Sequence, residues 1–175
     1  MTEREYWEKC AAFHGHQCPG LTIGFKASLY AMDLLDIDFS EDEDVVCVTE
    51  NDACGVDAVQ VMLGCSVGKG NLLFRLRGKQ AFSFFNRKTG KSVRLVLKSL
   101  PKMDRPEMFR WMQAQKPSDL FDVKEPGFVL PERARLFNTI ICSCCGETVS
   151  ENMIRIENGK NVCLDCLHPY DRFNI

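Results

Sequence analysis

The chain has 175 residues, of which 45% are hydrophobic and 26% charged, and its formal net charge is −2. This balance is typical of a globular protein and excludes a disordered, collagenous or coiled-coil chain, while the length suits one domain with a small appendage. Because the pI is about 5.9, no overall positive field attracts nucleic acid.

Ten cysteines are an unusual number for such a chain. The N-terminal segment Met1–Glu5 is charged and does not resemble a signal peptide, and no apolar run reaches the roughly 18 residues of a membrane span. We therefore expect a cytoplasmic protein without a membrane partner. In that reducing environment, clustered cysteines indicate metal ligands or redox groups rather than disulfides.

The first third of the chain predicts helices on either side of a strand. A short amphipathic segment over 6–13 precedes a helix over 19–35, whose first turn accommodates Pro19. The β-branched run Val45–Thr49 predicts a largely buried strand. Apolar residues at helical spacing then predict a helix over 56–63, which Gly64 ends.

The middle of the chain predicts strands and one more helix. The extended segments cover 72–76, 81–85 and 92–97, and the turn-forming run Asn86–Gly90 joins the last two in a hairpin. Asp104 is the expected N-cap of a helix that continues through Met112 and ends at Pro117. The order of elements predicts an α+β domain with a mixed sheet flanked by helices.

Three turn-forming residues, Pro126, Gly127 and Pro131, indicate an interdomain linker. The predicted organisation is therefore a core domain over 1–125, a linker over 126–138 and a small domain over 139–175. The last domain is too short to form a stable core without a metal ion or a disulfide.

The small domain carries two Cys-x2-Cys pairs at the spacing of a structural zinc site, Cys142 with Cys145 and Cys163 with Cys166. Four thiolates complete a tetrahedron around zinc and leave no open position, so the expected role is stabilising. Asn158-Gly159 predicts a hairpin between the pairs, and a short helix is expected to begin at Cys163.

Two other side chains of the small domain are alternative zinc ligands. Cys144 lies inside the first pair, and His168, two residues beyond the second pair, is the weaker candidate. A nucleic-acid-binding role is disfavoured, because residues 142–175 contain three basic and five acidic side chains.

A second group of chemically active residues lies in the core domain. In an extended segment, His14, His16 and Cys18 share one face, because side chains alternate across a strand. Cys18 and Cys54 each directly precede a helix, where the helix dipole is expected to lower the pKa of a thiol. Cys65, just after the second helix, is expected to return to the same place.

These histidines and cysteines predict a soft-metal or redox site with an open coordination position. The alternative is a set of buried structural cysteines with a packed histidine, which is the preferred interpretation for Cys10 and Cys47. The loop over 64–71 departs from the phosphate-loop pattern, but Lys69 is a candidate contact to an anion or substrate.

Four motifs occur in order between about residues 10 and 100: FHGHxCPGLxxG from Phe13, CxxDAxQ from Cys54, GCSxGKGNL from Gly64 and GKxAF from Gly78. Together they resemble the signature of the FmdE family, which is named for a component of formylmethanofuran dehydrogenase. The C-terminal cysteine quartet is similar to the zinc finger that some members of this family append.

The resemblance implies a thioredoxin-like α+β core and a treble-clef finger at the cysteine quartet. It also implies an active site at the HGHxCPG segment that can hold zinc. Carried over by position, the catalytic candidates are His14, His16, Cys18, Cys54, Cys65 and Lys69. The candidate ligands of a second zinc or another soft metal are His16, Cys18 and Cys54.

The enzyme that gives the family its name is a molybdenum enzyme that reduces carbon dioxide onto methanofuran in methanogens, although family members also occur in other organisms. The first hypothesis is thus a metalloprotein of one-carbon or molybdoenzyme metabolism with a redox or metal-dependent role. The alternative is a non-catalytic accessory or assembly subunit that binds partners through the finger. Molybdoenzyme subunits and a second copy of the chain, forming a homodimer, are the expected partners.

Overall fold

A five-stranded mixed sheet organises residues 1–134, the first of the two units into which the chain divides. The second unit comprises residues 135–175. The computed structural model describes residues 1–173. The last two residues of the predicted small domain, 174 and 175, therefore lie outside the described residues.

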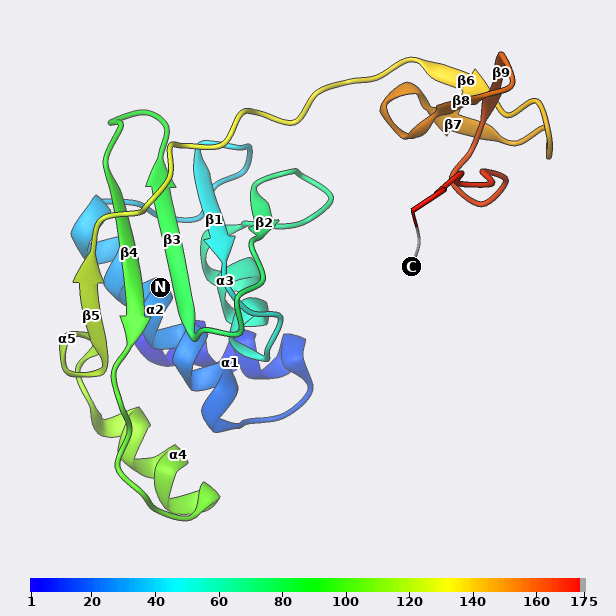
Figure 1. Ribbon diagram of the computed structural model, residues 1–175. Coiled ribbons are helices and arrows are strands. Elements are labelled where there is room, and N and C mark those ends of the chain that lie inside the picture. The colour runs from blue at the N-terminus through cyan, green and yellow to red at the C-terminus, as the bar shows by residue number, and fades with distance from the viewer. Residues whose placement is uncertain (174–175) are drawn as a thin grey trace. The chain divides into compact units, whose positions relative to one another are not determined.

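The first unit combines five helices with the five strands of this sheet (Figure 1). Its elements are α1 (Glu3–His14), α2 (Pro19–Leu35), β1 (Val45–Thr49), α3 (Gly55–Leu63), β2 (Leu72–Phe74), β3 (Ala81–Asn86), β4 (Ser92–Leu97), α4 (Arg105–Ala114), α5 (Pro117–Leu120) and β5 (Phe121–Lys124). The strand order is β2-β1-β3-β4-β5, in which β1 and β2 are parallel and the other neighbours antiparallel. The α+β class with a mixed sheet flanked by helices is confirmed, whereas the finer thioredoxin-like description stays a prediction.

Helices α1, α2 and α3 cover one face of this sheet, behind it in Figure 1. The main core lies between these helices and the sheet. It includes fully buried side chains from both, such as Phe25 of α2, Met62 of α3, and Phe82 and Phe84 of β3. Burial of such large side chains contributes roughly 2–3 kcal/mol each to folding. This layer places the last residue of α1 and the N-termini of α2 and α3 close together.

Glycines allow α2 and α3 to approach so closely that their backbones touch. A Cβ atom added at Gly24 would lie only 1.8 Å from the backbone oxygen of Gly55, so a side chain is excluded there. Near the start of α2, a Cβ at Gly20 would lie 3.1 Å from Cβ of Cys54. The crossing therefore brings together Cys18 and Cys54, the residues that immediately precede these two helices.

The segment after β5 is packed on the opposite face of the sheet for part of its length. Phe128 lies against Phe85, with ring centroids 5.8 Å apart, and the guanidinium of Arg75 lies 5.0 Å from the Phe128 centroid. The backbone N–H of Ala134 donates to the carboxylate of Glu43. Phe128 and Leu130 are thus partly buried against this face, and the first unit extends to Ala134, while the predicted linker over 126–138 stays a prediction.

The second unit consists of two small hairpins. Its elements are β6 (Thr139–Ile141), β7 (Thr148–Ser150), the 3-10 helix η1 (Glu151–Met153), β8 (Arg155–Glu157) and β9 (Lys160–Val162). Asn158 and Gly159 both have positive φ and form the turn between β8 and β9, which confirms the predicted hairpin.

The short helix expected from Cys163 is absent from the described residues, where a turn covers 164–166. Pro169 disfavours helical backbone at the residue before it and leaves too few residues for a stable helix. Among residues 1–173, no helix combines the length and apolar character that crossing a membrane requires.

Candidate metal centres

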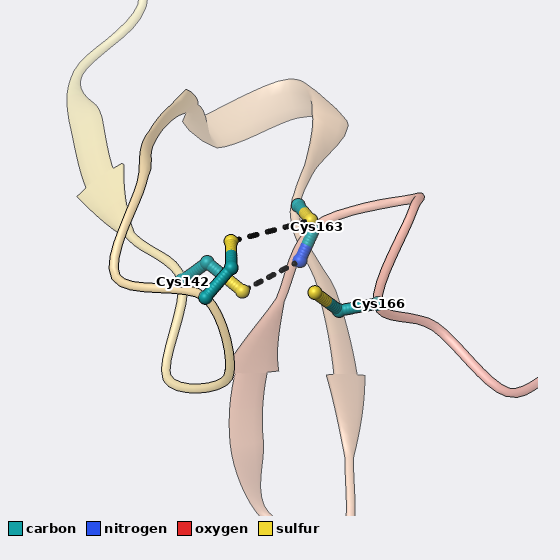
Figure 2. A group of neighbouring side chains, drawn as sticks. Cys142, Cys163 and Cys166 are labelled. Carbon is teal, nitrogen blue, oxygen red and sulfur yellow. Dashed lines mark hydrogen bonds between the residues drawn. The ribbon is translucent and has the colours of Figure 1, made fainter.

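The four paired cysteines of the second unit converge on one point. The sulfur atoms of Cys142, Cys145, Cys163 and Cys166 all lie within 4.8 Å of one another, and those of Cys145 and Cys163 are 4.0 Å apart. Zinc–sulfur bonds of about 2.3 Å in a tetrahedron place the sulfurs about 3.8 Å apart. Figure 2 shows Cys142 directed toward Cys163 and Cys166, which lie together on another turn. The donor set therefore fits zinc.

Backbone N–H groups prepare Cys142 to act as a thiolate. Its sulfur accepts hydrogen bonds from the N–H groups of Cys163, at 3.3 Å, and Cys144, at 3.4 Å. The N–H groups of Cys145, Cys163 and Cys144 lower the pKa of the Cys142 thiol to about 6, since they stabilise its charged form. The pKa of Cys166 is raised, because the thiols of Cys163 and then Cys144 lie against it.

The two alternative zinc ligands have other surroundings. Cys144 is exposed and its sulfur lies outside the four-thiol group, although it is close to Cys166. His168 is directed to Glu157, whose carboxylate accepts the His168 backbone N–H at 2.9 Å and lies 3.4 Å from Nδ1 of its ring.

A second group of potential metal donors forms where α1 ends and α2 begins. Nitrogen atoms of His14 and His16 and the sulfur of Cys18 lie within 4.8 Å of one another. Nε2 of His14 is 3.8 Å from Sγ of Cys18. The two imidazole rings are 4.4 Å apart between centroids. The sequence therefore correctly indicated that these three side chains meet.

The backbone that brings them together differs from the extended segment that we expected. His14 is the last residue of α1, and Gly15, with φ of 85°, ends that helix in the left-handed region. Cys18 is the N-cap of α2, and its sulfur accepts the N–H of Leu21 at 3.3 Å. A helix end and a tight turn thus replace strand alternation as the reason for the convergence.

A carboxylate fixes the orientation of His14. Nδ1 of His14 lies 2.7 Å from Oδ2 of Asp57, and the other carboxylate oxygen of Asp57 accepts a hydrogen bond from Gln60 at 3.2 Å. A proton on Nδ1 donates to the carboxylate, which leaves the lone pair of Nε2 on the side of Cys18. Metal-binding histidines commonly show this arrangement.

Asp57 was not among the predicted site residues, although it is part of the CxxDAxQ motif. The available signal was its position in the first turn of α3, three residues after Cys54. Residues three apart on a helix lie on the same side, so Asp57 and Cys54 face the same neighbourhood.

Cys54 lies next to Cys18, a member of the core donor group. A Cβ atom added at Gly20 would lie 3.4 Å from Sγ of Cys54 and 3.8 Å from Sγ of Cys18, which places both sulfurs around the same small space. The expected lowering of the Cys54 pKa is wrong: burial raises it, and the neighbouring Cys18 raises it further. The physical reason is that the Cys54 thiol accepts no N–H group of α3, unlike Cys18 on α2.

Two further predicted site residues lie elsewhere in the first unit. Cys54 and Cys65 flank the nine residues of α3, a length of about 14 Å, so one ion cannot bind both. Sγ of Cys65 is directed to the backbone oxygen of Val45, and burial raises the pKa of this thiol to about 12. Nζ of Lys69 donates to the backbone oxygen of Ser40 at 2.6 Å, so it stabilises a loop.

Cys10 and Cys47 are fully buried, as the structural interpretation of these residues requires. Burial raises the pKa of Cys10 to about 12 and that of Cys47 well above its usual value. Neither thiol is part of the two donor groups found among residues 1–173.

A cavity of about 410 Å³ lies beside the core donor group. His14 and Cys54 form part of its wall, together with Asp57 and Gln60 of α3 and Phe74 of β2. The cavity therefore adjoins the core donor group at His14, whereas His16 and Cys18 are not part of its wall.

The family of the chain follows from a comparison with protein-family models. The model described as "FmdE, Molybdenum formylmethanofuran dehydrogenase operon" matches residues 13–140. The chain belongs to the FmdE family. The prokaryotic dksA/traR C4-type zinc finger matches residues 135–172. Both parts of the resemblance noted in the sequence are confirmed at the level of the family.

Two individual proteins are similar to this FmdE-family chain. A crystal structure of a tungsten formylmethanofuran dehydrogenase FmdE-like protein from Syntrophus aciditrophicus is 25% identical, with a TM-score of 0.66 over 95% of this chain and 92% of the other. A probable S-adenosyl-L-methionine-binding protein of Archaeoglobus fulgidus is 29% identical over 90% of this chain. The chain spans about half the length, 51%, of that curated relative.

The FmdE match begins one residue before His14 and includes the complete core donor group. The finger match includes all four cysteines of the second unit. A C4 zinc finger at the C-terminus is therefore shown by family and geometry together, while the roles of the core residues stay predictions.

Proposed function

We propose that this FmdE-family chain is a two-site zinc protein, with a structural zinc in the finger and a second soft metal ion in the core. His14, His16 and Cys18 would hold the second ion. The observation that carries this proposal is the position of His14 between two groups, with Nδ1 at 2.7 Å from Asp57 and Nε2 at 3.8 Å from Cys18. A carboxylate behind a histidine fixes the ring with its free nitrogen toward the ion.

The finger site is proposed to stabilise the fold. Its four thiolates complete a tetrahedron, so no position is open for a substrate. The buried cluster of the second unit contains only Cys142, Val162 and Cys163 in the described residues, which is too little apolar material for independent stability. Metal binding therefore supplies most of the folding free energy of this unit.

The core site is proposed to be the site of metal-dependent catalysis. Three donors leave one position of a tetrahedron, which either Cys54 completes or a ligand from the cavity occupies. In the open form, a bound metal supplies Lewis-acid chemistry, such as polarisation of a carbonyl or activation of water. Asp57 keeps the proton on Nδ1 of His14, and Gln60 holds Asp57 in place through its other oxygen.

The names of the similar proteins suggest where such a site would act. The Syntrophus aciditrophicus protein is described as FmdE-like and is named for a tungsten formylmethanofuran dehydrogenase, and the Archaeoglobus fulgidus relative is described as binding S-adenosyl-L-methionine. For this chain we propose a role in one-carbon metabolism, in association with a molybdenum or tungsten oxidoreductase.

A second candidate function is that of a docking subunit, which the surface of the finger favours. Ile141, Ile156 and Leu164 are large apolar side chains that are 64%, 69% and 49% exposed. An exposed apolar patch is typical of a protein-binding surface, and these side chains are the candidates to form one. In this function the finger binds a partner protein, and the core metal stabilises the first unit without catalysis.

Metal counting on the full chain tests the two-site proposal. Protein purified without added metal should contain about two ions per chain by elemental analysis. Cys18→Ser should remove the core ion alone, and Cys163→Ser should remove the finger ion alone. A single zinc that persists in Cys18→Ser and is lost in Cys163→Ser would contradict the core site.

A further inference from the structure

The cavity beside the core donor group has a distinct chemical lining. Its apolar lining includes Val67, Leu72 and Phe74, of which Val67 and Phe74 are 63% and 45% exposed. Its polar lining includes Asp52, Asp57 and Gln60. At about 410 Å³, its volume lies within the range of small-molecule sites. A ligand in it would contact His14, apolar side chains and the carboxylates of Asp52 and Asp57.

Among residues 1–173, no lysine or arginine lines this cavity. The basic residues that neighbour the lining along the chain have other contacts. Arg75 and Lys79 act on the carboxylate of Glu50, whose pKa falls chiefly through its hydrogen bonds with Arg94. Nζ of Lys69 donates to the backbone oxygen of Ser40, and Arg77 donates to the backbone oxygen of Leu76. Asp52 is exposed and makes no ion pair within the described part of the chain. Its charge is therefore available to a ligand.

The dipole of α3 does not reverse the preference of this cavity for a cation. The positive end of the helix lies at Gly55, beside the cavity, and would favour an anion. Asp57 already occupies the first turn of α3, where a carboxylate offsets the positive end of the dipole. The carboxylate of Asp52 then adds a negative charge to the wall of the cavity, which favours a cation.

We propose that this cavity binds a small cationic organic ligand. One end of the ligand is a donor to the core metal, its apolar middle packs on Leu72 and Phe74, and its positive end lies beside Asp52. This inference rests on the proposed core metal site and adds the class of its ligand: cations are preferred and anions are disfavoured.

Three thiols of similar length and different charge probe this preference on the full chain loaded with cobalt(II). Cysteamine ends in an ammonium group, 2-mercaptoethanol in a hydroxyl and 3-mercaptopropionate in a carboxylate, and each offers a sulfur to the metal. The change in the cobalt absorption bands gives the dissociation constant. The same titration of Cys18→Ser, which keeps the finger, supplies the background to subtract.

The expected order of affinity is cysteamine, then 2-mercaptoethanol, then 3-mercaptopropionate. Asp52→Asn should reduce the preference for cysteamine over 3-mercaptopropionate about fivefold, the effect of losing one partly exposed charge interaction. Comparing this ratio between proteins cancels the different acidities of the thiols. Asp122→Asn is the matched control, because Asp122 is exposed on β5 at the other edge of the sheet, and it should leave the ratio unchanged.

The outcomes separate this inference from the proposal on which it rests. A wild-type chain with no cobalt spectrum beyond that of Cys18→Ser lacks the core site, which overturns both. A core cobalt spectrum together with an equal ratio in wild type and Asp52→Asn, or with tighter binding of 3-mercaptopropionate, overturns the cationic ligand alone.

Discussion

Nδ1 of His14 lies 2.7 Å from Oδ2 of Asp57, although 43 positions separate the two residues. His14 ends α1 and Asp57 lies in the first turn of α3, so the packing of these two helices creates the contact. The His14 side chain is only 11% exposed, which limits the other orientations of its ring. The relationship fixes which nitrogen is free to bind a metal ion.

Replacing Asp57 by asparagine should therefore weaken the core metal site. We expect Asp57→Asn to bind the core ion about 10- to 100-fold more weakly, because the imidazole loses the charged group that orients it. Titration with a competing chelator measures the change, and the finger ion serves as an internal reference. Unchanged core affinity in Asp57→Asn would show that the contact has no part in metal binding.

The close crossing of α2 and α3 predicts an intolerance to a single methyl group. Gly24→Ala would place its Cβ 1.8 Å from the backbone oxygen of Gly55, so the helices must separate. We expect a loss of about 3 kcal/mol in the free energy of unfolding, measured by urea denaturation, together with a weaker core metal site. Gly68→Ala is the control, since a Cβ there meets nothing within 4 Å. Equal stability of the two variants would contradict the crossing.

The ion pair of Glu50 and Arg94 predicts a dependence of core stability on pH. The Arg94 guanidinium bonds both oxygens of Glu50, at 2.6 and 2.9 Å, and these bonds lower the pKa of Glu50 below its ordinary 4.5. A lowered pKa in the folded state stabilises the fold above the ordinary pKa, and this contribution is lost as the pH falls through the lowered value.

We expect Glu50→Gln to cost about 3 kcal/mol near neutral pH, because it leaves the largely buried charge of Arg94 unpaired. The difference from wild type should shrink in acid, once Glu50 itself is protonated. Urea denaturation at neutral and acidic pH measures both values. Glu8→Gln removes an exposed partner of Arg4 and should cost much less than Glu50→Gln, with little dependence on pH. A loss of unfolding free energy in Glu50→Gln that does not vary with pH would contradict the lowered pKa of Glu50.

Chelation should affect the two units differently. Since the finger has almost no apolar core, removing its zinc should unfold residues from about 135 onward while the first unit stays folded. Limited proteolysis of the full chain before and after treatment with a strong chelator measures this. Cys163→Ser should show the treated pattern without chelator. Unchanged protease resistance of the finger would contradict a structural zinc.

Most of the first unit could be predicted from the sequence because its signals are local. Pro19 marks the start of α2, Gly64 the end of α3, and the β-branched run Val45–Thr49 forms a central strand. β5 was not predicted, since Phe121–Lys124 is short and becomes a strand only by pairing with β4. No periodic pattern within residues 121–124 predicts the pairing with β4.

The core site shows the same division between local and long-range information. Cys18 and Cys54 were predicted to belong to one site because of their chemistry, and the Gly24–Gly55 crossing explains how they come together. Nothing in the local pattern of α3 connects Asp57 with His14, and the same pattern suggested that Cys65 returns to the site. The finger could be predicted in full as a metal site because its ligand spacing is itself the signal.

Anomalous X-ray scattering at the zinc edge, from crystals of the full chain grown without added metal, tests the two-site account most directly. The account predicts one peak among the four finger sulfurs and a second among His14, His16 and Cys18. A finger peak with no density above background at the core group would contradict the second site.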